Sequence, residues 1–165
     1  MNDKYLLSDE TREVSGHRLR RIKALKEIGA YARAGQTGGW IESEKNLSES
    51  GDAWISDEAL VFGEAQVFGD ALVFGVASVT GNARVSGNAR VGDKAWISDE
   101  AWVSDDALVS GKARVSGYAR IEDEAWVGDQ AWIAGKVRVS GYARVGGQMR
   151  LAGNEWVSGE MKMTG

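Results

Sequence analysis

The sequence predicts an all-β protein whose chain coils around one long axis, and three regularities predict it. Residues 51–165 repeat every six positions with no insertion or deletion. Gly or Asp opens every unit, and Ala follows two positions later in fifteen of the nineteen units. Val or Ile follows two positions after that in seventeen of them. Such self-similarity at a fixed period is the signature of a repeat architecture.

Each six-residue unit is expected to form a short strand and a tight turn. Ala83 and Val85 stand two positions apart, so both point to one side of an extended strand, while Arg84 points to the other. Gly or Asp at the opening position suits a positive φ angle, or an Asp side chain that bonds its own turn. Because the chain turns at every sixth residue with an unchanged inward face, it must coil around an interior of Ala, Val and Ile.

The gapless run over 51–165, of which GNARVSGNARVG at 81–92 is typical, resembles the left-handed parallel β-helix of hexapeptide-repeat proteins. That resemblance implies three units in each triangular turn of eighteen residues. Residues 51–165 would then form about six turns and one extra side, in a prism roughly 30 Å tall. The left hand also comes from the resemblance, since the usual rule for parallel crossovers favours the right hand.

Residues 1–36 are predicted to form a small head with a β-hairpin, and 37–50 the imperfect first units of the helix. Residues 5–7 favour a short strand, and 11–14 and 18–25 indicate a hairpin around Ser15 and Gly16. A helix over 18–28 is the alternative, because apolar residues recur there at every third position. We expect the head to cover the open end of the prism, which would otherwise expose apolar core and strand edges.

The head carries a second resemblance. The strings ETREVSGHRLRRIKAL and GGWIESEKNLS, followed by the repeats, are similar to phage and prophage hexapeptide-repeat proteins. Those proteins are often labelled as transferases of the isoleucine-patch acyltransferase superfamily. The segments GGWIE at 38–42 and NLS at 46–48 carry most of the likeness. It implies a mobile-element origin, and the label implies acyl transfer.

Charge is spread unevenly along the chain, whose formal net charge is −4. Residues 51–165 hold 11 Lys and Arg against 16 Asp and Glu, whereas 12–33 hold seven basic residues and two acidic ones. The sequence therefore predicts an acidic prism with a basic band near one end, which can orient a charged partner. The basic side chains proposed for binding in the head are Arg18, Arg20, Arg21, Lys23 and Lys26.

Composition excludes several classes of protein. The chain has no Cys, so it forms no disulfide and performs no thiol chemistry. It shows no apolar run of the length that a membrane span or a signal peptide requires. We expect a cytoplasmic protein of a bacterial host that does not contact the membrane.

Catalytic candidates are few. By resemblance, acyltransferases of this fold use a histidine base on a coil, and γ-carbonic anhydrases need three histidines for zinc. Residues 51–165 contain no histidine, and His17, beside the hairpin turn, is the single one in the chain. No phosphate-binding GxxxxGK[ST] loop is present either. We therefore expect no enzymatic activity, no cofactor and no bound metal.

One predicted corner of the prism gathers carboxylates. Residue 123 follows residue 105 by eighteen positions, so the two should stack in consecutive turns. The carboxylate side chains at this corner are Asp105, Asp106, Asp123 and Glu124. Four such groups could hold Ca²⁺. The alternative is structural, because Asp suits the turn and its neighbour faces solvent. The structural interpretation is the stronger of the two.

Trp and Arg dominate the outward position of the repeat, Trp54 included. Eighteen-residue spacing stacks them into columns, and the candidate binding face is Trp96, Trp102, Arg114, Arg120, Trp126, Trp132, Arg144 and Arg150. One interpretation is a ladder of cation–π contacts that stabilises the fold. The other is a binding face, because Trp and Arg are enriched at interface hot spots and also suit stacked bases and phosphates.

The last turn departs from the pattern. Its irregular residues, proposed as a subunit contact, are Met149, Glu155, Trp156, Met161 and Met163. Met suits adaptable apolar contacts, and an exposed strand edge invites pairing, so a homodimer or homotrimer is expected. The only three Phe residues, Phe62, Phe68 and Phe74, are expected to pack under the head or at such a contact.

The leading functional hypothesis is a non-enzymatic, oligomeric binding scaffold of a phage or prophage. It would occupy a host factor, with anti-defence as one such role and a nucleic-acid-handling protein or a nucleotide signal as the target. An acyltransferase and a structural spacer of a virion are the alternatives.

Overall fold

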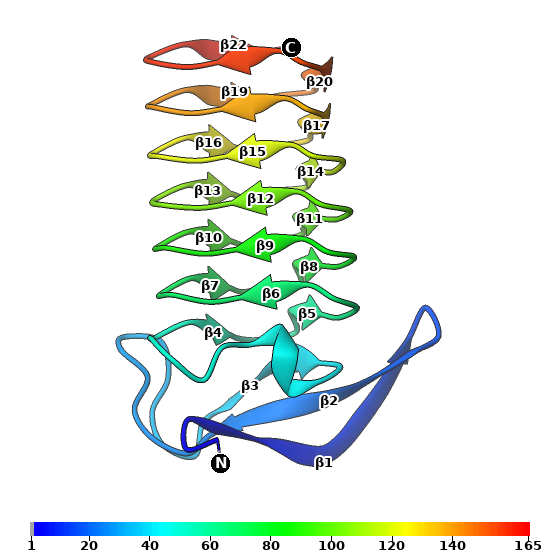
Figure 1. Ribbon diagram of the computed structural model, residues 1–165, viewed down its shortest axis with the longest axis vertical. Coiled ribbons are helices and arrows are strands. Elements are labelled where there is room, and N and C mark those ends of the chain that lie inside the picture. The colour runs from blue at the N-terminus through cyan, green and yellow to red at the C-terminus, as the bar shows by residue number, and fades with distance from the viewer. Residues whose placement is uncertain (1) are drawn as a thin grey trace.

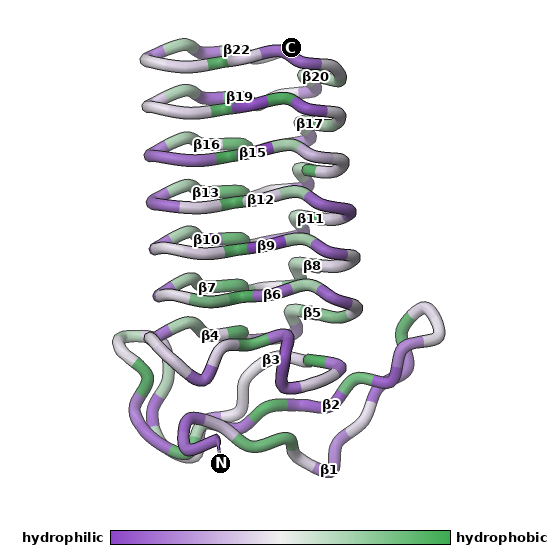
Figure 2. Tube along the Cα trace, in the orientation of Figure 1, coloured by the Kyte–Doolittle hydropathy of each residue, from purple (hydrophilic) through white to green (hydrophobic). Residues whose placement is uncertain are grey.

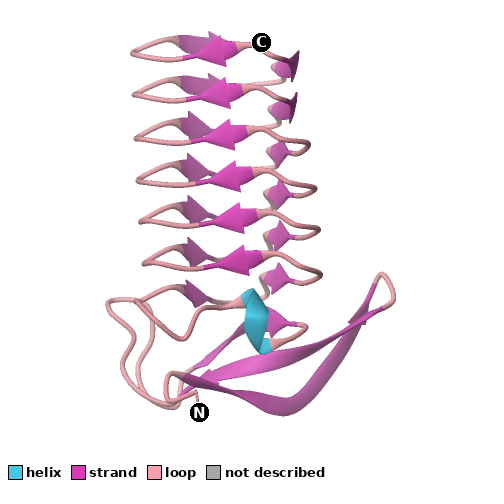
Figure 3. Ribbon diagram, in the orientation of Figure 1, coloured by secondary structure: helices cyan, strands magenta, loops and turns pink. Residues whose placement is uncertain are grey.

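The computed structural model describes residues 2–165 and has the chain as a parallel β-solenoid of about seven turns (Figure 1). Each regular turn contributes one short strand to each of three sheets, because the strand order in every sheet advances by three along the chain. Helix is almost absent from the described residues, and a single short 3-10 helix, η1 (Glu44–Asn46), stands between β3 and β4 (Figure 3). The expected all-β solenoid is confirmed.

The three sheets form the sides of the rod and are named here by their size. The nine-stranded sheet consists of β1 (Tyr5–Val14), β2 (His17–Ala24), β3 (Thr37–Ile41), β5 (Leu60–Val61), β8 (Ser78–Val79), β11 (Trp96–Ile97), β14 (Arg114–Val115), β17 (Trp132–Gly135) and β20 (Arg150–Gly153). The seven-stranded sheet consists of β4 (Trp54–Ile55), β7 (Leu72–Val73), β10 (Arg90–Val91), β13 (Leu108–Val109), β16 (Trp126–Val127), β19 (Arg144–Gly146) and β22 (Lys162–Thr164). The six-stranded sheet consists of β6 (Gln66–Val67), β9 (Arg84–Val85), β12 (Trp102–Val103), β15 (Arg120–Ile121), β18 (Arg138–Val139) and β21 (Trp156–Val157).

The core is a continuous column of small apolar side chains inside the turns. Ala83, Val85, Ala101 and Val103 are all fully buried, and the same two positions are buried in almost every unit. Apolar and polar residues alternate along each turn as the inward and outward positions require (Figure 2). Three chains converge on this interior, so a larger residue there would overpack it at a cost of about 1–3 kcal/mol.

The turn positions use a left-handed backbone. Gly81 has φ +67°, and Asp99, one turn later, has φ +58°. Asp is tolerated because its carboxylate accepts the amide N–H of the residue eighteen positions ahead, as Asp99 does from Gly117 at 2.9 Å. The same bond recurs from Asp57, Asp93, Asp105, Asp123 and Asp129. Turn Asp residues therefore link consecutive turns.

The N-terminal part forms a hairpin around Ser15 and Gly16, as expected, and differs from the prediction in the extent of its first strand. Residues 5–14 form one strand, β1, with an irregularity between Leu7 and Thr11, where two separate strands were expected. The alternative helix over 18–28 is wrong, because His17–Ala24 is strand β2, paired antiparallel with β1 and β3. Leu19 and Ile22 are fully buried, so their three-residue spacing reflects packing rather than a helical stripe.

The first turn of the solenoid begins in 37–50, ahead of the regular repeat. Trp40 and Ile41 of β3 pair with Leu60 and Val61 of β5, and Leu47 bridges Val67. Antiparallel β1 and β2 extend the same sheet beyond β3, and their loop projects sideways from the N-terminal end of the rod (Figure 1).

The expectation that Trp54 faces outward is wrong. Its position is outward in the repeat, yet the side chain is fully buried. Gly38 lies against the indole, so close that a Cβ atom there would stand 2.5 Å from Trp54 Cζ2. Gly38 of β3 thus covers the first outward position of the seven-stranded sheet, and among the described residues the Trp54 N–H has no hydrogen-bond partner.

Candidate functional site

The outward Trp and Arg side chains form three columns, one on each side of the rod. On the nine-stranded sheet the register is Ser78, Trp96, Arg114, Trp132 and Arg150. The six-stranded sheet has Arg84, Trp102, Arg120, Arg138 and Trp156 in register. The seven-stranded sheet has Arg90, Leu108, Trp126 and Arg144. Neighbours in a column are about 4.8 Å apart along the rod.

Within the columns each outward Trp from Trp96 onward is covered by an Arg of a neighbouring turn. The guanidinium carbon lies 5.4 to 5.9 Å from the indole centroid in the pairs Arg114–Trp96, Arg120–Trp102, Arg138–Trp156, Arg144–Trp126 and Arg150–Trp132. Each exposed contact of this kind contributes about 0.5–1 kcal/mol. The geometry therefore supports a structural ladder, but it leaves part of each indole accessible.

The indole N–H groups reveal a second regularity. In four Trp residues the N–H donates to a hydroxyl sixteen residues earlier: Trp96 to Thr80, Trp102 to Ser86, Trp126 to Ser110 and Trp156 to Ser140. Ser116 stands sixteen residues before Trp132 in the same way, yet among residues 2–165 the Trp132 N–H makes no such hydrogen bond. The sixteen-residue spacing is visible in the sequence and could have predicted these bonds.

Solvent exposure separates the Trp residues. Trp96, Trp132 and Trp156 are 46, 40 and 65 % exposed, whereas Trp102 and Trp126 are half-buried. Trp126 lies against Gly128, where a Cβ atom would stand 2.2 Å from the ring. The predicted binding face is thus split over three sides of the rod, and its two exposed indoles, Trp96 and Trp132, both lie on the nine-stranded side.

The nine-stranded column continues into the head. Arg21 pairs with Trp40, and Trp40 pairs with Leu60, so the head and the solenoid share one column. The Trp40 indole lies between the guanidinium groups of Arg12 and Arg21, at 5.9 and 4.9 Å. Glu58 accepts from Arg21 at 2.6 Å and from the Trp40 indole at 3.1 Å. The bond from Arg21, first, and that from Trp40 hold the pKa of Glu58 below its ordinary value.

The basic side chains of the head do not act as one patch. Arg20 donates to the backbone carbonyls of Ser8 and Leu7, and Lys26 pairs with Asp3. Arg21 is engaged with Glu58. Arg18 and Lys23 are exposed and make no hydrogen bond or ion pair with the other described residues. Internal pairing thus leaves two of the five predicted cations for an outside ligand.

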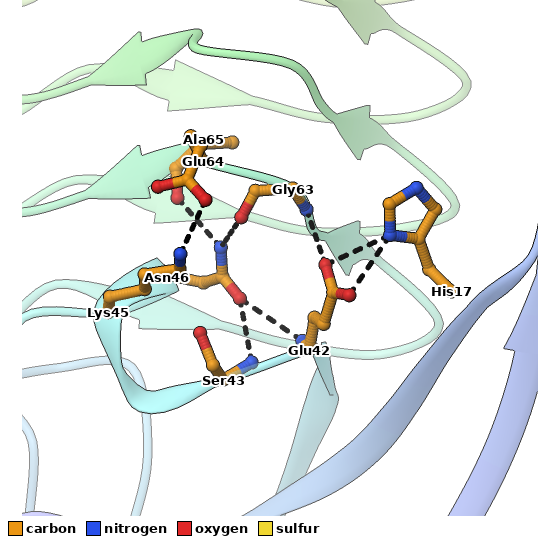
Figure 4. Close-up of polar contacts among 8 residues, drawn as sticks. All are labelled: His17, Glu42, Ser43, Lys45, Asn46, Gly63, Glu64 and Ala65. Atoms are coloured by element: carbon orange, nitrogen blue, oxygen red, sulfur yellow. Dashed lines mark hydrogen bonds and ion pairs between the residues drawn. The ribbon is translucent and has the colours of Figure 1, made fainter.

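The joint between head and solenoid centres on Asn46 (Figure 4). This fully buried side chain accepts the amide N–H groups of Glu42 and Ser43, and donates to the carbonyls of Gly63 and Ala65. Four backbone groups at the irregular start of the solenoid are satisfied by one amide. Sequence reasoning did not identify this role, because nothing in the local pattern around 46 marks it.

His17 belongs to the same joint. Its Nδ1 lies 3.0 Å from both carboxylate oxygens of Glu42, and its ring centroid is 4.9 Å from that of Phe62 (Figure 4 shows the Glu42 contact). Glu42 also accepts the Gly63 amide N–H at 2.8 Å. The bond with His17, followed by that from Gly63, lowers the pKa of Glu42. Phe62 therefore packs against the head, whereas Phe74 packs over Gly92 of the next turn.

The predicted corner of carboxylates is built as a turn. Asp105 and Asp123 accept backbone N–H groups of the following turn, and Asp106 accepts from Asn88 at 3.0 Å. Among the described residues, no three His, Cys, Asp or Glu side chains are grouped so that they could hold a metal ion. The carboxylates of Asp105, Asp106 and Asp123 are engaged in linking turns, which favours the structural interpretation over calcium.

The last turn leaves part of its interior open. Met161 is 48 % exposed, Glu155 and Trp156 are exposed, and Met149 and Met163 are partly buried against the core. Strands β20, β21 and β22 are the terminal members of their sheets. Among the described residues nothing pairs with their outer edges.

Comparison with known proteins supports the repeat architecture. Residues 83–99 match a family model described as YdcK Beta solenoid repeat. This segment spans β9 to β11 and holds the indole of Trp96. Among curated proteins, none matches the chain. Within the described residues, no helix has the length and apolar character that crossing a bilayer would require.

Proposed function

We propose that this chain is a non-enzymatic, oligomeric binding scaffold of a phage or prophage that occupies a host factor, with anti-defence as one such role. The observation that carries the proposal is the set of exposed indoles, Trp96, Trp132 and Trp156, fixed on a rigid rod by cation–π contacts. Trp and Arg held in place lose little conformational entropy on binding, and they dominate interface hot spots.

Within this proposal the solenoid has the left hand of the hexapeptide-repeat proteins that its repeat resembles, and the head caps its N-terminal end. The buried Trp54 and the four bonds of Asn46 support the capping role. The exposed Met161 at the opposite end supports assembly of two copies through their last turns. We place the protein in the cytoplasm of the bacterial host.

The acyltransferase alternative would need His17 as its base. That side chain is held by Glu42 and Phe62 at the joint between head and solenoid, which supports a structural role. Acyl transfer from acetyl-CoA that disappears in His17→Ala would replace the scaffold proposal with this alternative.

Native mass spectrometry of the protein purified from its natural host tests the proposal, because it reports the assembly and any bound component together. We expect a bound host component that is lost when Trp96 and Trp132 are both changed to Ala, while the melting temperature changes little. Recovery of the same component at the same occupancy with the double variant would contradict the proposal.

A further inference from the structure

The nine-stranded side of the rod differs from the other two in charge. Two positions before each outward residue, the part of this side from β11 to β20 holds Lys94, Lys112, Gln130 and Gln148, whereas its N-terminal part holds Glu58 and Val76. On the seven-stranded side the same position holds Asp52, Asp70, Asn88, Asp106, Glu124, Tyr142 and Glu160. On the six-stranded side it holds Glu64, Asn82, Glu100, Tyr118, Lys136 and Asn154. The acidic rod therefore carries one predominantly basic strip, which runs from Lys94 to Arg150.

A groove of about 350 Å³ opens in this strip. It is lined by Lys112, Arg114, Gln130, Trp132 and Arg150. Three cationic groups and one amide surround one indole, and no carboxylate is among the lining residues. Asp129, the turn residue that directly precedes Gln130 in the sequence, uses its carboxylate to accept the Gly147 amide N–H at 2.8 Å. The groove therefore presents hydrogen-bond donors and a flat aromatic surface together.

Among the outward indoles that are not fully buried, from Trp96 to Trp156, Trp132 is the one whose N–H makes no hydrogen bond within residues 2–165. Arg150 covers one part of its ring at 5.4 Å, and the side chain stays 40 % exposed. Arg114, its neighbour on the other side, lies over Trp96 at 5.5 Å and reaches the groove. An indole with an accessible ring and an unused donor, between cations, suits an anionic ligand that carries an aromatic ring.

A second groove on the six-stranded side provides an internal comparison. It holds the equivalent pair, with Arg120 over Trp102 at 5.5 Å, but Glu64 and Glu100 also line it. The Trp102 N–H is already bound to Ser86 at 2.9 Å. The two grooves share their scaffold and differ in charge and in the free donor, so only the groove at Trp132 is complementary to an anion.

We propose that the groove at Trp132 is a nucleotide site. The base stacks on the Trp132 indole, and the phosphate groups are bound by Lys112 and Arg114 with Arg150 at the far edge. The assignment rests on the proposed function, in which the outward side chains are a binding surface. To that function it adds the class of ligand, a nucleotide. A free nucleotide and one unit of a single strand share this chemistry, and the experiment separates them.

Isothermal titration of the full chain with ATP, with a short oligothymidylate and with inorganic triphosphate tests the site. Gln130→Glu adds a carboxylate at an exposed position of the groove lining and leaves the Trp132 indole unaltered. We expect it and Trp132→Ala each to weaken binding of ATP or of the oligonucleotide roughly tenfold or more. The matched controls Glu100→Gln and Trp102→Ala, in the second groove, should leave that binding within about twofold. Tighter binding of the oligonucleotide identifies a single strand as the source, and equal or tighter binding of ATP identifies a free nucleotide.

Three results would overturn the assignment: no binding of ATP or oligonucleotide, triphosphate binding as tight as ATP, or affinity unchanged in Gln130→Glu. Circular dichroism of each variant shows whether its fold is retained. The proposed function is judged separately, by mass spectrometry of the host component. If that component stays bound to the wild-type protein while nucleotides do not bind, the nucleotide site fails and the scaffold remains.

Discussion

Arg150 lies over the indole of Trp132 as Arg120 lies over that of Trp102, yet only Trp102 donates its N–H to a serine. The guanidinium-to-ring distances, 5.4 and 5.5 Å, are almost equal. The two pairs occupy equivalent places in the repeat. Comparing them therefore separates what the aromatic ring contributes to stability from what the indole hydrogen bond contributes.

Replacing each of these Trp residues with Phe should therefore have unequal effects on stability. Trp102→Phe keeps an aromatic ring beneath Arg120 but leaves the nearly buried Ser86 hydroxyl without its donor, so it should lower the free energy of unfolding by about 1 kcal/mol. Trp132→Phe loses no hydrogen bond and should cost less than about 0.5 kcal/mol. Urea unfolding measures both. Equal losses would mean that the Ser86 bond contributes nothing.

Asn46→Ala should destabilise the joint between head and solenoid strongly. The change removes partners of four backbone groups in a site that is fully buried, so we expect a loss of about 3 kcal/mol or more. Asn88→Ala is the matched control, because Asn88 is exposed and bonds only Asp106 through its side chain; it should cost less than about 0.5 kcal/mol. Similar urea midpoints for the two variants would refute the importance of Asn46.

The regular part of the fold could be predicted because each unit repeats one local solution. Ala and Val at alternate positions determine which face is inward, and the gapless spacing then determines which residues stack, so Trp96, Arg114 and Trp132 were placed in register correctly. Such information is local and recurs along the chain.

The irregular contacts could not be predicted because they join segments without a repeat between them. Trp54 occupies an outward position, and its burial depends on the head, whose path is set by Gly38 and β2. The pairing of Arg20 and Arg21 inside the head likewise depends on tertiary contacts with Ser8 and Glu58. Composition indicated a basic patch there, but charge counts do not show which cations are already neutralised.

Lys4 should make the stability depend on alkaline pH. Its side chain is almost fully buried and donates to the Ser48 carbonyl at 3.0 Å, and burial, partly offset by Asp52, lowers its pKa to about 8. Between pH 8 and the ordinary lysine value near 10.4, the unfolded chain binds more protons than the folded one, so stability rises with pH.

Burial raises the pKa of Tyr5. Above pH 10 the unfolded chain therefore loses the Tyr5 proton before the folded chain does, so stability falls as pH rises. The window for Lys4 is therefore pH 8 to 10. Lys4→Met should remove the rise in urea-unfolding free energy across that window relative to the wild-type protein. The same rise in both proteins would show that Lys4 is not its source.

The last turn should mediate self-association. Met161 is 48 % exposed beside the partly buried Met163, and β20, β21 and β22 present unpaired outer edges within the described chain. Removing residues 147–165 takes away that surface and exposes the turn below, whose corresponding residues follow the regular repeat. Because turns contact mainly their neighbours, the remaining solenoid should stay folded. We expect the mass from light scattering to fall to that of a monomer, while Trp96→Ala, on the side of the rod, leaves the assembly unchanged. An assembly that survives the deletion and dissociates in Trp96→Ala would place the interface on the side column instead.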